Sequence, residues 1–343
     1  MKVLIVRLSS LGDVIHTFPA LTDLAAARPE TELDWLVEEG FASFAGLHPA
    51  VDSVVGLAER RLRWPPNRWP AYVSSRRWLR GQLETRRYDL VVDLQGLMKS
   101  ALVARMPGSP VAGYDAKSIR EPTASPFYDR KYAVSRDLHA VERNRRLLAA
   151  AIGYDVPATP ADFGLAVAGR KEVPALPERF CALVHSASWP SKLWPEENWR
   201  RLVGHLATRG LSVVLPWGSN EEKARAERIA AGNKDAIVLP DRLDGADLAA
   251  AIGGARCAIG LDSGLMHLAA ALAVPGVWLF GPTDPGLTGP CSANQSVVQS
   301  TGENAPCRTR DCAHGPAGRT CMDMVDFDRV AAAIDELLES TTP

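Results

Sequence analysis

The stretch VLIVRLSSLGDVIHTFPALTDLA, residues 3–25, contains the unit from which the rest of the chain is built. Residues 3–8 are apolar apart from Arg7, and residues 9–13, SSLGD, supply the small residues and the glycine of a turn. Apolar residues then recur at helical spacing up to Ala25. The stretch therefore predicts a buried strand, a glycine turn and an amphipathic helix, in that order.

The same alternation of strand and helix continues through the first half of the chain. Strand-like runs lie at residues 33–37 and 89–94, and the second run leads into a helical stretch at residues 97–105. Buried strands that alternate with helices form a parallel sheet that is covered on both faces. Prolines then cluster between residues 153 and 177, where periodicity is weak, and they predict a linker between two domains.

The alternation begins again after the linker and predicts a second doubly wound α/β domain. Its predicted strands are residues 180–185, 212–216, 236–239, 257–261 and 276–280, and its predicted helices are residues 195–209, 221–231, 244–252 and 265–272. A last helix, residues 327–338, is apolar on one face, and we expect it to pack back on the first domain. The expected layout is a first domain at residues 1–155, a linker at 156–178, a second domain at 179–325 and a C-terminal helix at 326–343.

Composition and charge argue against several classes of protein. The chain has 39 Lys and Arg residues against 40 Asp and Glu residues, a net charge of −1, so no overall basic field favours nucleic acid. A membrane-spanning helix needs about 20 mostly apolar residues, and the most apolar stretch is interrupted by His267 and Pro275. The apolar run near the start of the chain is too short for a signal peptide. We therefore expect a cytoplasmic protein that binds no nucleic acid.

Ligands of open α/β sheets bind at the carboxyl ends of the strands, and several loops there carry polar side chains. In the first loop, Asp13 is either a simple N-cap or a base that acts on a bound hydroxyl group. In the second, residues 185–188 and Lys192 are either a phosphate cradle or a solvated serine-rich turn. In the third, Glu222 is either a ribose ligand or an ordinary acid at a helix start.

The fourth loop, residues 260–267 (GLDSGLMH), gives the strongest signal because several polar groups meet at one helix start. Asp262 can accept hydrogen bonds from sugar hydroxyls, and the N–H groups of Ser263 and Gly264 can face a diphosphate. His267 follows on the first helical turn, where a purely structural histidine is the alternative. The chain has neither G-x-G-x-x-G nor G-x-x-x-x-G-K-[ST], which argues against a dinucleotide fold, an NAD-linked oxidoreductase and a P-loop.

Residues 60–87 concentrate positive charge. Nine arginines and one glutamate, Glu84, give this segment a charge of +8, and it also holds Trp64, Trp69 and Trp78. Arginine suits phosphate groups and tryptophan suits the membrane–water interface, so the segment predicts a docking face for an anionic membrane surface or a phosphorylated lipid. The alternative is a solubilising face whose tryptophans turn inward. No signature of an RNA-binding module accompanies it.

The cysteines do not form the framework of a secreted disulfide protein, because Cys181 and Cys257 lie in apolar, strand-like runs. The other cysteines lie in a Gly- and Pro-rich stretch together with His314, and they are Cys291, Cys307, Cys312 and Cys321. Their spacing differs from the paired C-x2-C form of common zinc sites. A small metal site and a redox-sensitive loop both remain open, and we assign no catalytic role to the stretch.

Nine stretches, taken together, resemble the ADP-heptose lipopolysaccharide heptosyltransferases, glycosyltransferase family 9, and are most similar to the heptosyltransferase I branch. They are VLIVRLSSLGDVIHTFPALTD, DWLVEEGFA, DLVVDLQGLMKSAL, REPTASPFYDRKY, HAVER, KLWPEENW, LPWGSNEE, GLDSGLMHLAAAL and FGPTDPGLTGP. The resemblance implies a GT-B type α/β fold, two Rossmann-like doubly wound domains that face a central cleft. It also implies inverting transfer of L-glycero-D-manno-heptose from ADP-heptose to the Kdo of Kdo2-lipid A, at the cytoplasmic face of the inner membrane as a peripheral protein.

Residue by residue, the resemblance places Asp13 at the catalytic base and Lys192 at the cation that offsets charge on the departing ADP. The donor-contacting positions are Ala187, Ser188, Lys192, Glu222, Leu243, Asp262, Ser263, Gly264 and His267. The positions that meet the anionic acceptor are Arg60, Arg61, Arg63 and Arg120. The resemblance implies no metal and no cofactor, since ADP-heptose is a co-substrate and the lysine and helix N-termini can carry its diphosphate.

The chain departs from the family pattern in two places. Ala187 stands where a hydroxyl-bearing residue is expected, and residues 291–321 look more like the cysteine-rich tails of heptosyltransferase II and of autotransporter-modifying relatives. The acceptor therefore stays open between Kdo2-lipid A, a heptosylated core and a protein side chain. A non-catalytic protein that binds nucleotide sugars is the alternative of a different class, although it would not need Asp13 opposite the donor.

Overall fold

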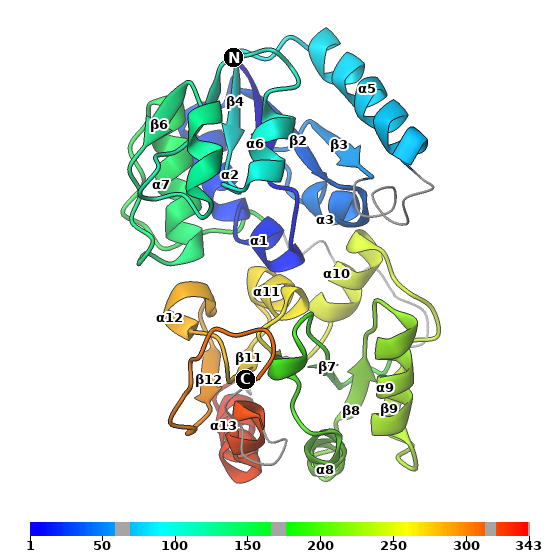
Figure 1. The fold of residues 1–343 in the computed structure, drawn as a ribbon. Coiled ribbons are helices and arrows are strands. Elements are labelled where there is room, and N and C mark those ends of the chain that lie inside the picture. The colour runs from blue at the N-terminus through cyan, green and yellow to red at the C-terminus, as the bar shows by residue number, and fades with distance from the viewer. Residues whose placement is uncertain (59–68, 166–175, 313–319, 342–343) are drawn as a thin grey trace. The chain divides into compact units, whose positions relative to one another are not determined.

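The computed structural model describes residues 1–58, 69–165, 176–312 and 320–341. The chain divides into two compact units, residues 1–165 and 166–343. Each unit is built around its own parallel sheet of six strands, with helices between the strands (Figure 1). The division lies within the segment in which the prolines predict a linker.

The sheet of the first unit has the strand order β3-β2-β1-β4-β5-β6, and all its paired strands are parallel. Its strands are β1 (Lys2–Val6), β2 (Glu32–Glu38), β3 (Ser53–Leu57), β4 (Leu90–Asp93), β5 (Val111–Tyr114) and β6 (Arg130–Tyr132). Its helices are α1 (Leu11–Ile15), α2 (Phe18–Ala27), α3 (Ala42–Ala45), α5 (Trp69–Thr85), α6 (Met98–Ala104) and α7 (Ala140–Ile152), with 3-10 turns η1 (Glu39–Phe41) and η3 (Pro122–Phe127). The apolar residues of β1 are fully buried because helices cover both faces of the sheet.

The helix that residues 3–25 predict is in fact two helices. The first, α1, ends at Ile15, and α2 begins at Phe18 with Thr17 as its N-cap and a proline in its first turn. Pro19 has no N–H group to donate to the carbonyl of Ile15, so one continuous helix cannot pass through it. The break leaves α1 as a short turn of helix directly after the first strand-end loop.

The sheet of the second unit has the order β12-β11-β10-β7-β8-β9 and is also parallel. Its strands are β7 (Phe180–Val184), β8 (Ser212–Leu215), β9 (Ala236–Val238), β10 (Cys257–Leu261), β11 (Gly276–Phe280) and β12 (Gln295–Gln299). Its helices are α8 (Glu196–Ala207), α9 (Asn220–Ala230), α10 (Gly245–Gly253), α11 (Gly264–Ala271), α12 (Pro285–Thr288) and α13 (Phe327–Ser340), with 3-10 turns η4 (Pro190–Lys192) and η6 (Cys321–Met324). The prediction of two doubly wound α/β halves is thus confirmed.

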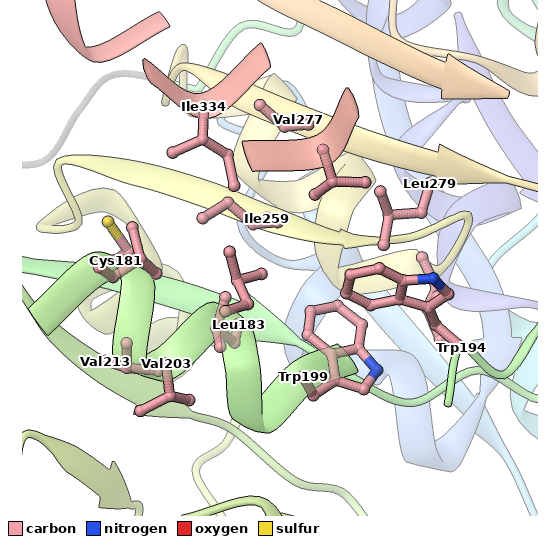
Figure 2. Close-up of a cluster of buried hydrophobic side chains, with 14 of the residues drawn as sticks. Cys181, Leu183, Trp194, Trp199, Val203, Val213, Ile259, Val277, Leu279 and Ile334 are labelled. Atoms are coloured by element: carbon pink, nitrogen blue, oxygen red, sulfur yellow. The ribbon is translucent and has the colours of Figure 1, made fainter. Parts of the chain in front are cut away.

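One apolar core joins the sheet of the second unit to α8 and α13 (Figure 2). The rings of Trp194 and Trp199 meet edge to face at 5.1 Å, and the indole N–H of Trp194 donates to the carbonyl of Val325 at 3.0 Å. Ile334 of α13 is fully buried against this cluster, and burial of such a side chain stabilises a fold by about 1.5–3 kcal/mol.

The expected docking of the last helix on the first domain is therefore wrong. The apolar face of α13, with Val330, Ile334 and Leu337, is buried within the second unit, where the helix packs against β11, β12 and α8. At the rim of this contact Asp335 accepts a hydrogen bond from Nη2 of Arg209, and its Oδ1 lies 3.1 Å from Nε2 of His205. Helix periodicity predicts an apolar face but not the partner that covers it.

None of the helices described is long and apolar enough to cross a membrane.

Candidate active site

The loops at the carboxyl ends of β7 and β10 bring Lys192 and Asp262 together. These strands are neighbours in the sheet, so the segments that follow them leave at the same edge. The Nζ group of Lys192 donates to Oδ2 of Asp262 at 2.7 Å and to its backbone carbonyl at 3.0 Å. The lysine side chain is 14% exposed and the aspartate side chain 6%, so the ion pair is mostly withdrawn from water.

A third polar side chain completes this cluster. Nε2 of His267 lies 3.4 Å from Oδ1 of Asp262, and the imidazole ring packs against Trp278 at 4.9 Å. Burial alone would raise the pKa of Asp262, but the hydrogen bond from His267 and the charge of Lys192 outweigh it and hold that pKa well below its usual range. Asp262 is therefore ionised, and its two oxygens are held by two different side chains.

The N-terminus of α11 lies directly beside this cluster. Ser263 is the N-cap, with an extended backbone, and the hydroxyl of Ser263 is buried without a partner among the described residues. A Cβ at Gly260 would lie 2.6 Å from Cβ of Val184 and 2.7 Å from Sδ of Met266, so this glycine allows α11 to approach the sheet closely. Free N–H groups at a helix start favour an anion, and Gly264 is the first residue of that helix.

The segment after β7 gives Ala187 and Ser188 different surroundings. Ala187 is partly buried against the apolar core, which fits an alanine where a hydroxyl-bearing residue was expected, whereas Ser188 is exposed. The preceding His185 is fully buried, and Nδ1 of His185 lies 2.9 Å from the hydroxyl of Ser186. Burial, followed by the nearby charge of Arg225, lowers the pKa of His185 to about 4. A neutral histidine therefore underlies this loop at neutral pH.

At the carboxyl end of β8, Glu222 is half-buried on the first turn of α9. Its Oε2 accepts from the N–H of Gly218 at 2.6 Å. Leu243 and Trp217 pack against the same small cluster of apolar residues, and the indole N–H of Trp217 donates to the carbonyl of Leu239 at 2.6 Å. Trp217 was not among the residues expected to contact the donor. An apolar patch beside a carboxylate can hold a nucleoside, so Trp217 belongs among the candidate residues.

In the first unit, Asp13 occupies the third position of α1 rather than the N-cap. Its Oδ2 accepts from the N–H of Ser10 at 2.8 Å and from the hydroxyl of Ser10 at 3.0 Å, and its side chain is 37% exposed. The interpretation of Asp13 as a simple N-cap is therefore wrong, since Ser10 is the cap. The carboxylate is tied to the backbone on one side and open to solvent on the other, as a base toward an incoming hydroxyl requires.

Two residues that sequence reasoning missed lie behind Asp13. Nη1 of Arg7 is 4.0 Å from Oδ1 of Asp13, and Nη2 of Arg7 donates to the side-chain oxygen of Asn144 on α7. The amide of Asn144 in turn donates to the carbonyl of His16 at 2.9 Å. Arg7 is buried although it lies in an apolar run, and a charge in such a run is the signal that could have identified it.

The acceptor arginines predicted from the sequence are only partly described. Arg60, Arg61 and Arg63 lie outside the described residues, and Arg120 is exposed. Of the basic segment, α5 is described: Leu79 and Leu83 are buried, whereas Trp78 is 62% exposed. The alternative in which the tryptophans turn inward is therefore wrong for Trp78.

The clustered cysteines are partly buried and are not joined by disulfide bonds in the described part of the chain. Burial, and then the nearby thiols of Cys307 and Cys312, raise the pKa of Cys321 to about 11. Burial likewise raises the pKa of Cys291 to about 11. In residues 1–58, 69–165, 176–312 and 320–341, no group of three or more His, Cys, Asp or Glu side chains is arranged to hold a metal ion. His314 lies outside these ranges.

Comparisons with known proteins agree with this arrangement. The profile of glycosyltransferase family 9 (heptosyltransferase) matches residues 76–317. Lipopolysaccharide heptosyltransferase 1 of Pseudomonas aeruginosa is 47% identical over 356 aligned positions, which cover 98% of each chain.

Two solved structures are also similar over nearly the whole length. The structure of E. coli heptosyltransferase WaaC with ADP superposes with a TM-score of 0.85 at 38% identity and covers 98% of this chain and 100% of that one. WaaC with ADP-2-deoxy-2-fluoro heptose gives a TM-score of 0.81 at 36% identity, with 100% of both chains covered. These are α/β glycosyltransferases of the GT-B type, as the resemblance predicted. The chain therefore belongs to glycosyltransferase family 9, the heptosyltransferases.

Proposed function

We propose that this enzyme transfers L-glycero-D-manno-heptose from ADP-heptose to the Kdo of Kdo2-lipid A, an inner-core step of lipopolysaccharide biosynthesis. The observation that carries the proposal is the Lys192–Asp262–His267 cluster at the N-terminus of α11. It places one lysine ammonium and the backbone N–H groups of a helix start at the edge of the sheet where a nucleotide diphosphate would lie. The relatives whose names state heptose transfer in lipopolysaccharide synthesis support the same substrate class.

In this proposal the second unit holds the donor. Lys192 and the N–H groups of Ser263 and Gly264 face the diphosphate, and Asp262 and His267 orient the lysine and contact the sugar. Glu222 accepts from the ribose hydroxyls. Leu243 and Trp217 flank the adenine, and Ala187 and Ser188 line the same side of the loop after β7. Because the lysine and the helix start supply the positive charge, the reaction needs neither a resident metal nor a cofactor.

The first unit supplies the base. Asp13 accepts the proton of the acceptor hydroxyl while that oxygen attacks the anomeric carbon, and the bond from that carbon to the diphosphate oxygen breaks. ADP leaves with the bonding electron pair, and Lys192 offsets the negative charge that develops on it. Attack from the face opposite the leaving group inverts the anomeric centre. Arg7 lies behind Asp13, with its Nη1 4.0 Å from Oδ1 of the carboxylate.

We further propose that the enzyme is cytoplasmic and works at the cytoplasmic face of the inner membrane as a peripheral protein. Kdo2-lipid A is an anionic lipid, and Arg60, Arg61, Arg63 and Arg120 would meet its charged head group. The described part of the basic segment supports this role, because α5 presents Arg77, Trp78 and Arg80 outward from a buried Leu79 and Leu83. Basic side chains next to an exposed tryptophan suit an anionic membrane surface.

The deciding experiment measures ADP release from ADP-heptose with and without Kdo2-lipid A, for the wild type and for Asp13→Asn. Asparagine keeps an acceptor for the N–H of Ser10 and removes the base. We expect the wild type to release ADP only when the acceptor is present, and the rate of release to fall about 10²-fold or more in the variant. The affinity for ADP-heptose, measured by calorimetry, should be the same in both. Asp89→Ala is the matched control, since Asp89 also accepts from a backbone N–H but lies at the amino edge of the same sheet.

Other outcomes identify the alternatives. If ADP is released only with a heptosylated core or a protein as acceptor, the enzyme is a heptosyltransferase with a different acceptor. Tight ADP-heptose binding without release on any acceptor would make the chain a nucleotide-sugar-binding protein. Wild-type turnover in Asp13→Asn would remove this carboxylate from the mechanism.

A further inference from the structure

Ser191, the residue before the candidate phosphate lysine, is buried although it is polar. It is 2% exposed and lies in η4, the single 3-10 turn that carries Lys192. Its hydroxyl donates to the carbonyl of Thr309 at 2.9 Å, and its N–H donates to the carbonyl of Arg310 at 3.4 Å. Both contacts reach more than a hundred residues along the chain, into the stretch whose cysteines had no assigned role.

The same cysteine-bearing stretch also forms hydrogen bonds to the loop after β11, which leaves the sheet at the same edge. The N–H of Arg308 donates to the carbonyl of Pro282 at 2.7 Å, and Nη2 of Arg308 donates to Asp284 at 2.7 Å. Pro282 and Asp284 follow β11, so residues 307–310 join the segment after β11 to the turn after β7. We refer to residues 307–310 as the clasp.

Two cysteines of the same stretch make further contacts in and near the clasp. The thiol of Cys307 lies 3.0 Å from the hydroxyl of Thr309. Sγ of Cys321 lies so close to Gly281 that a Cβ there would be 3.0 Å away, and the carbonyl of Cys321 accepts from Ser300 at 2.6 Å. The cysteine-bearing stretch therefore packs under the loop after β11, next to the place where the clasp meets it.

A fixed turn matters for Lys192 because the reach of its side chain depends on where its Cα lies. A 3-10 turn of three residues has few hydrogen bonds of its own, and η4 has Lys192 N–H to Trp189 and Leu193 N–H to Pro190 at 3.1 Å each. The side chain reaches from the turn to Asp262, and its Nζ lies 5.1 Å from the centre of the Trp189 ring. Misplacement of a catalytic group by about 1 Å can cost on the order of 10²-fold in rate.

We propose that Ser191 is a positioning residue for Lys192: through its bonds to the clasp it fixes the turn from which the lysine reaches the departing diphosphate. The inference rests on the role of Lys192 given under the proposed function. Ser191 touches no reacting atom and acts only through its neighbour, so its contribution must disappear when the lysine is absent.

The test is a double-mutant cycle of Ser191→Ala and Lys192→Met, read out as kcat and KM for ADP-heptose. Ser191→Ala should lower kcat about 10-fold and change KM less than 3-fold, because a displaced cation loses more toward the transition state than toward the ground state. Ser191→Cys, with a similar volume and a weak S–H donor, should lie between Ser191→Ala and the wild type. In the Lys192→Met background, Ser191→Ala should have no further effect on kcat.

Thr208→Ala is the control, since the hydroxyl of Thr208 also donates to a backbone carbonyl, that of His205, on an exposed helix end. A thermal melt of each variant checks that the variant is folded. Single-turnover experiments allow rates to be measured for the slow Lys192 variants. Unchanged kcat in Ser191→Ala, or losses that multiply in the double variant, would overturn the positioning role alone. A fully active Lys192→Met enzyme would overturn the role of the lysine and this inference together.

Discussion

The ammonium of Lys192 lies 2.7 Å from a carboxylate oxygen of Asp262 and 3.0 Å from the carbonyl oxygen of the same residue. These two contacts hold the lysine ammonium at Asp262, the residue directly before the N-cap of the following helix, α11. The pair is mostly buried, so loss of one member leaves the other charge without compensation. Variants of this pair can therefore separate the contribution of Lys192 to stability from its contribution to the rate of the reaction.

We expect Lys192→Met to lower kcat by about 10²-fold or more and to destabilise the second unit by on the order of 3 kcal/mol, because Asp262 then stays buried without its cation. Adding Asp262→Asn removes the orphaned charge and should restore most of the stability while kcat stays low. Calorimetric melts and ADP-release rates of the two single variants and the double variant provide the measurement. Recovery of activity in the double variant would mean that the lysine serves only to neutralise Asp262.

The outer face of α5 leads to a second prediction, about membranes. Replacing Arg77 and Arg80 by Gln and Trp78 by Ser should weaken binding to vesicles that contain phosphatidylglycerol, by roughly 10-fold or more, since each basic residue near an anionic surface contributes about 1 kcal/mol. Binding should also fall with added salt, because the interaction is between exposed charges. Co-sedimentation with anionic and with zwitterionic vesicles measures both effects.

Arg146→Gln is the control for this experiment, because Arg146 is 54% exposed on α7 of the same unit and lies outside the basic segment. Equal loss of vesicle binding in the control would show a response to net charge alone. Unchanged binding in the triple variant would make α5 a solubilising helix.

The sequence predicted most of the secondary structure of the sheets because their central strands are buried on both faces. The runs at residues 3–6 and 257–261 are continuously apolar for this reason, and each of these two strands appears where it was expected. Four strands were missed, β3, β5, β6 and β12. Of these, β3, β6 and β12 are edge strands with partly exposed positions, and β5 is buried but only four residues long. A continuous apolar run therefore identifies the longer central strands, but it is a weaker signal for strands at a sheet edge and for very short strands.

For the candidate site, the sequence indicated which loops carry its residues, but not which of those residues contact one another. Strand-end loops pointed to Lys192 and Asp262 separately, yet the hydrogen bond between them joins residues 70 positions apart. Arg7 and Asn144 are 137 positions apart, and no local pattern links an arginine in an apolar run to an asparagine on a helix. Ser191 was invisible for the same reason, because its partner is a backbone carbonyl and any residue type can provide one.

Two buried histidines predict how stability depends on pH. Burial lowers the pKa of His48 to about 4, partly offset by Asp162, and the pKa of His185 is lowered to about 4 as well. Nδ1 of His48 accepts from the N–H of Ala50 at 3.2 Å, so a proton there would face a donor. An unfolded histidine takes up its proton near pH 6.5, so between pH 6.5 and 4 the unfolded chain binds more protons than the folded one.

Stability should therefore be full above pH 6.5 and fall as the pH drops toward 4, by up to about 1.4 kcal/mol per pH unit for each histidine. Denaturant unfolding at several pH values between 7.5 and 4.5 measures the slope. His48→Gln should reduce the slope because it removes one of the two titrating groups. A variant with the same slope as the wild type would show that other groups govern the acid sensitivity.

Alanine substitutions at two glycines of the second unit should have opposite effects on stability, because one glycine is closely packed and the other lies in an open helix position. At Gly260 a new Cβ would lie 2.6 Å from Cβ of Val184 and 2.7 Å from Sδ of Met266, whereas at Gly204 on α8 it would meet nothing within 4 Å. Gly260→Ala should therefore destabilise the unit by about 1–3 kcal/mol, since the strand and α11 must move apart. Gly204→Ala should stabilise it by up to about 1 kcal/mol, because alanine favours a helix interior.

The two variants also differ in their expected effect on the donor site. Gly260 lies two residues before Asp262, on the strand that positions the carboxylate, so displacement of α11 should raise KM for ADP-heptose in Gly260→Ala and leave it unchanged in Gly204→Ala. Melting temperatures, which shift by about 2–4 °C per kcal/mol in a unit of this size, and donor kinetics on both variants provide the measurement. A Gly260→Ala enzyme as stable as the wild type, with the same KM, would mean that α11 has room to spare and that the glycine is not what sets its distance from the sheet.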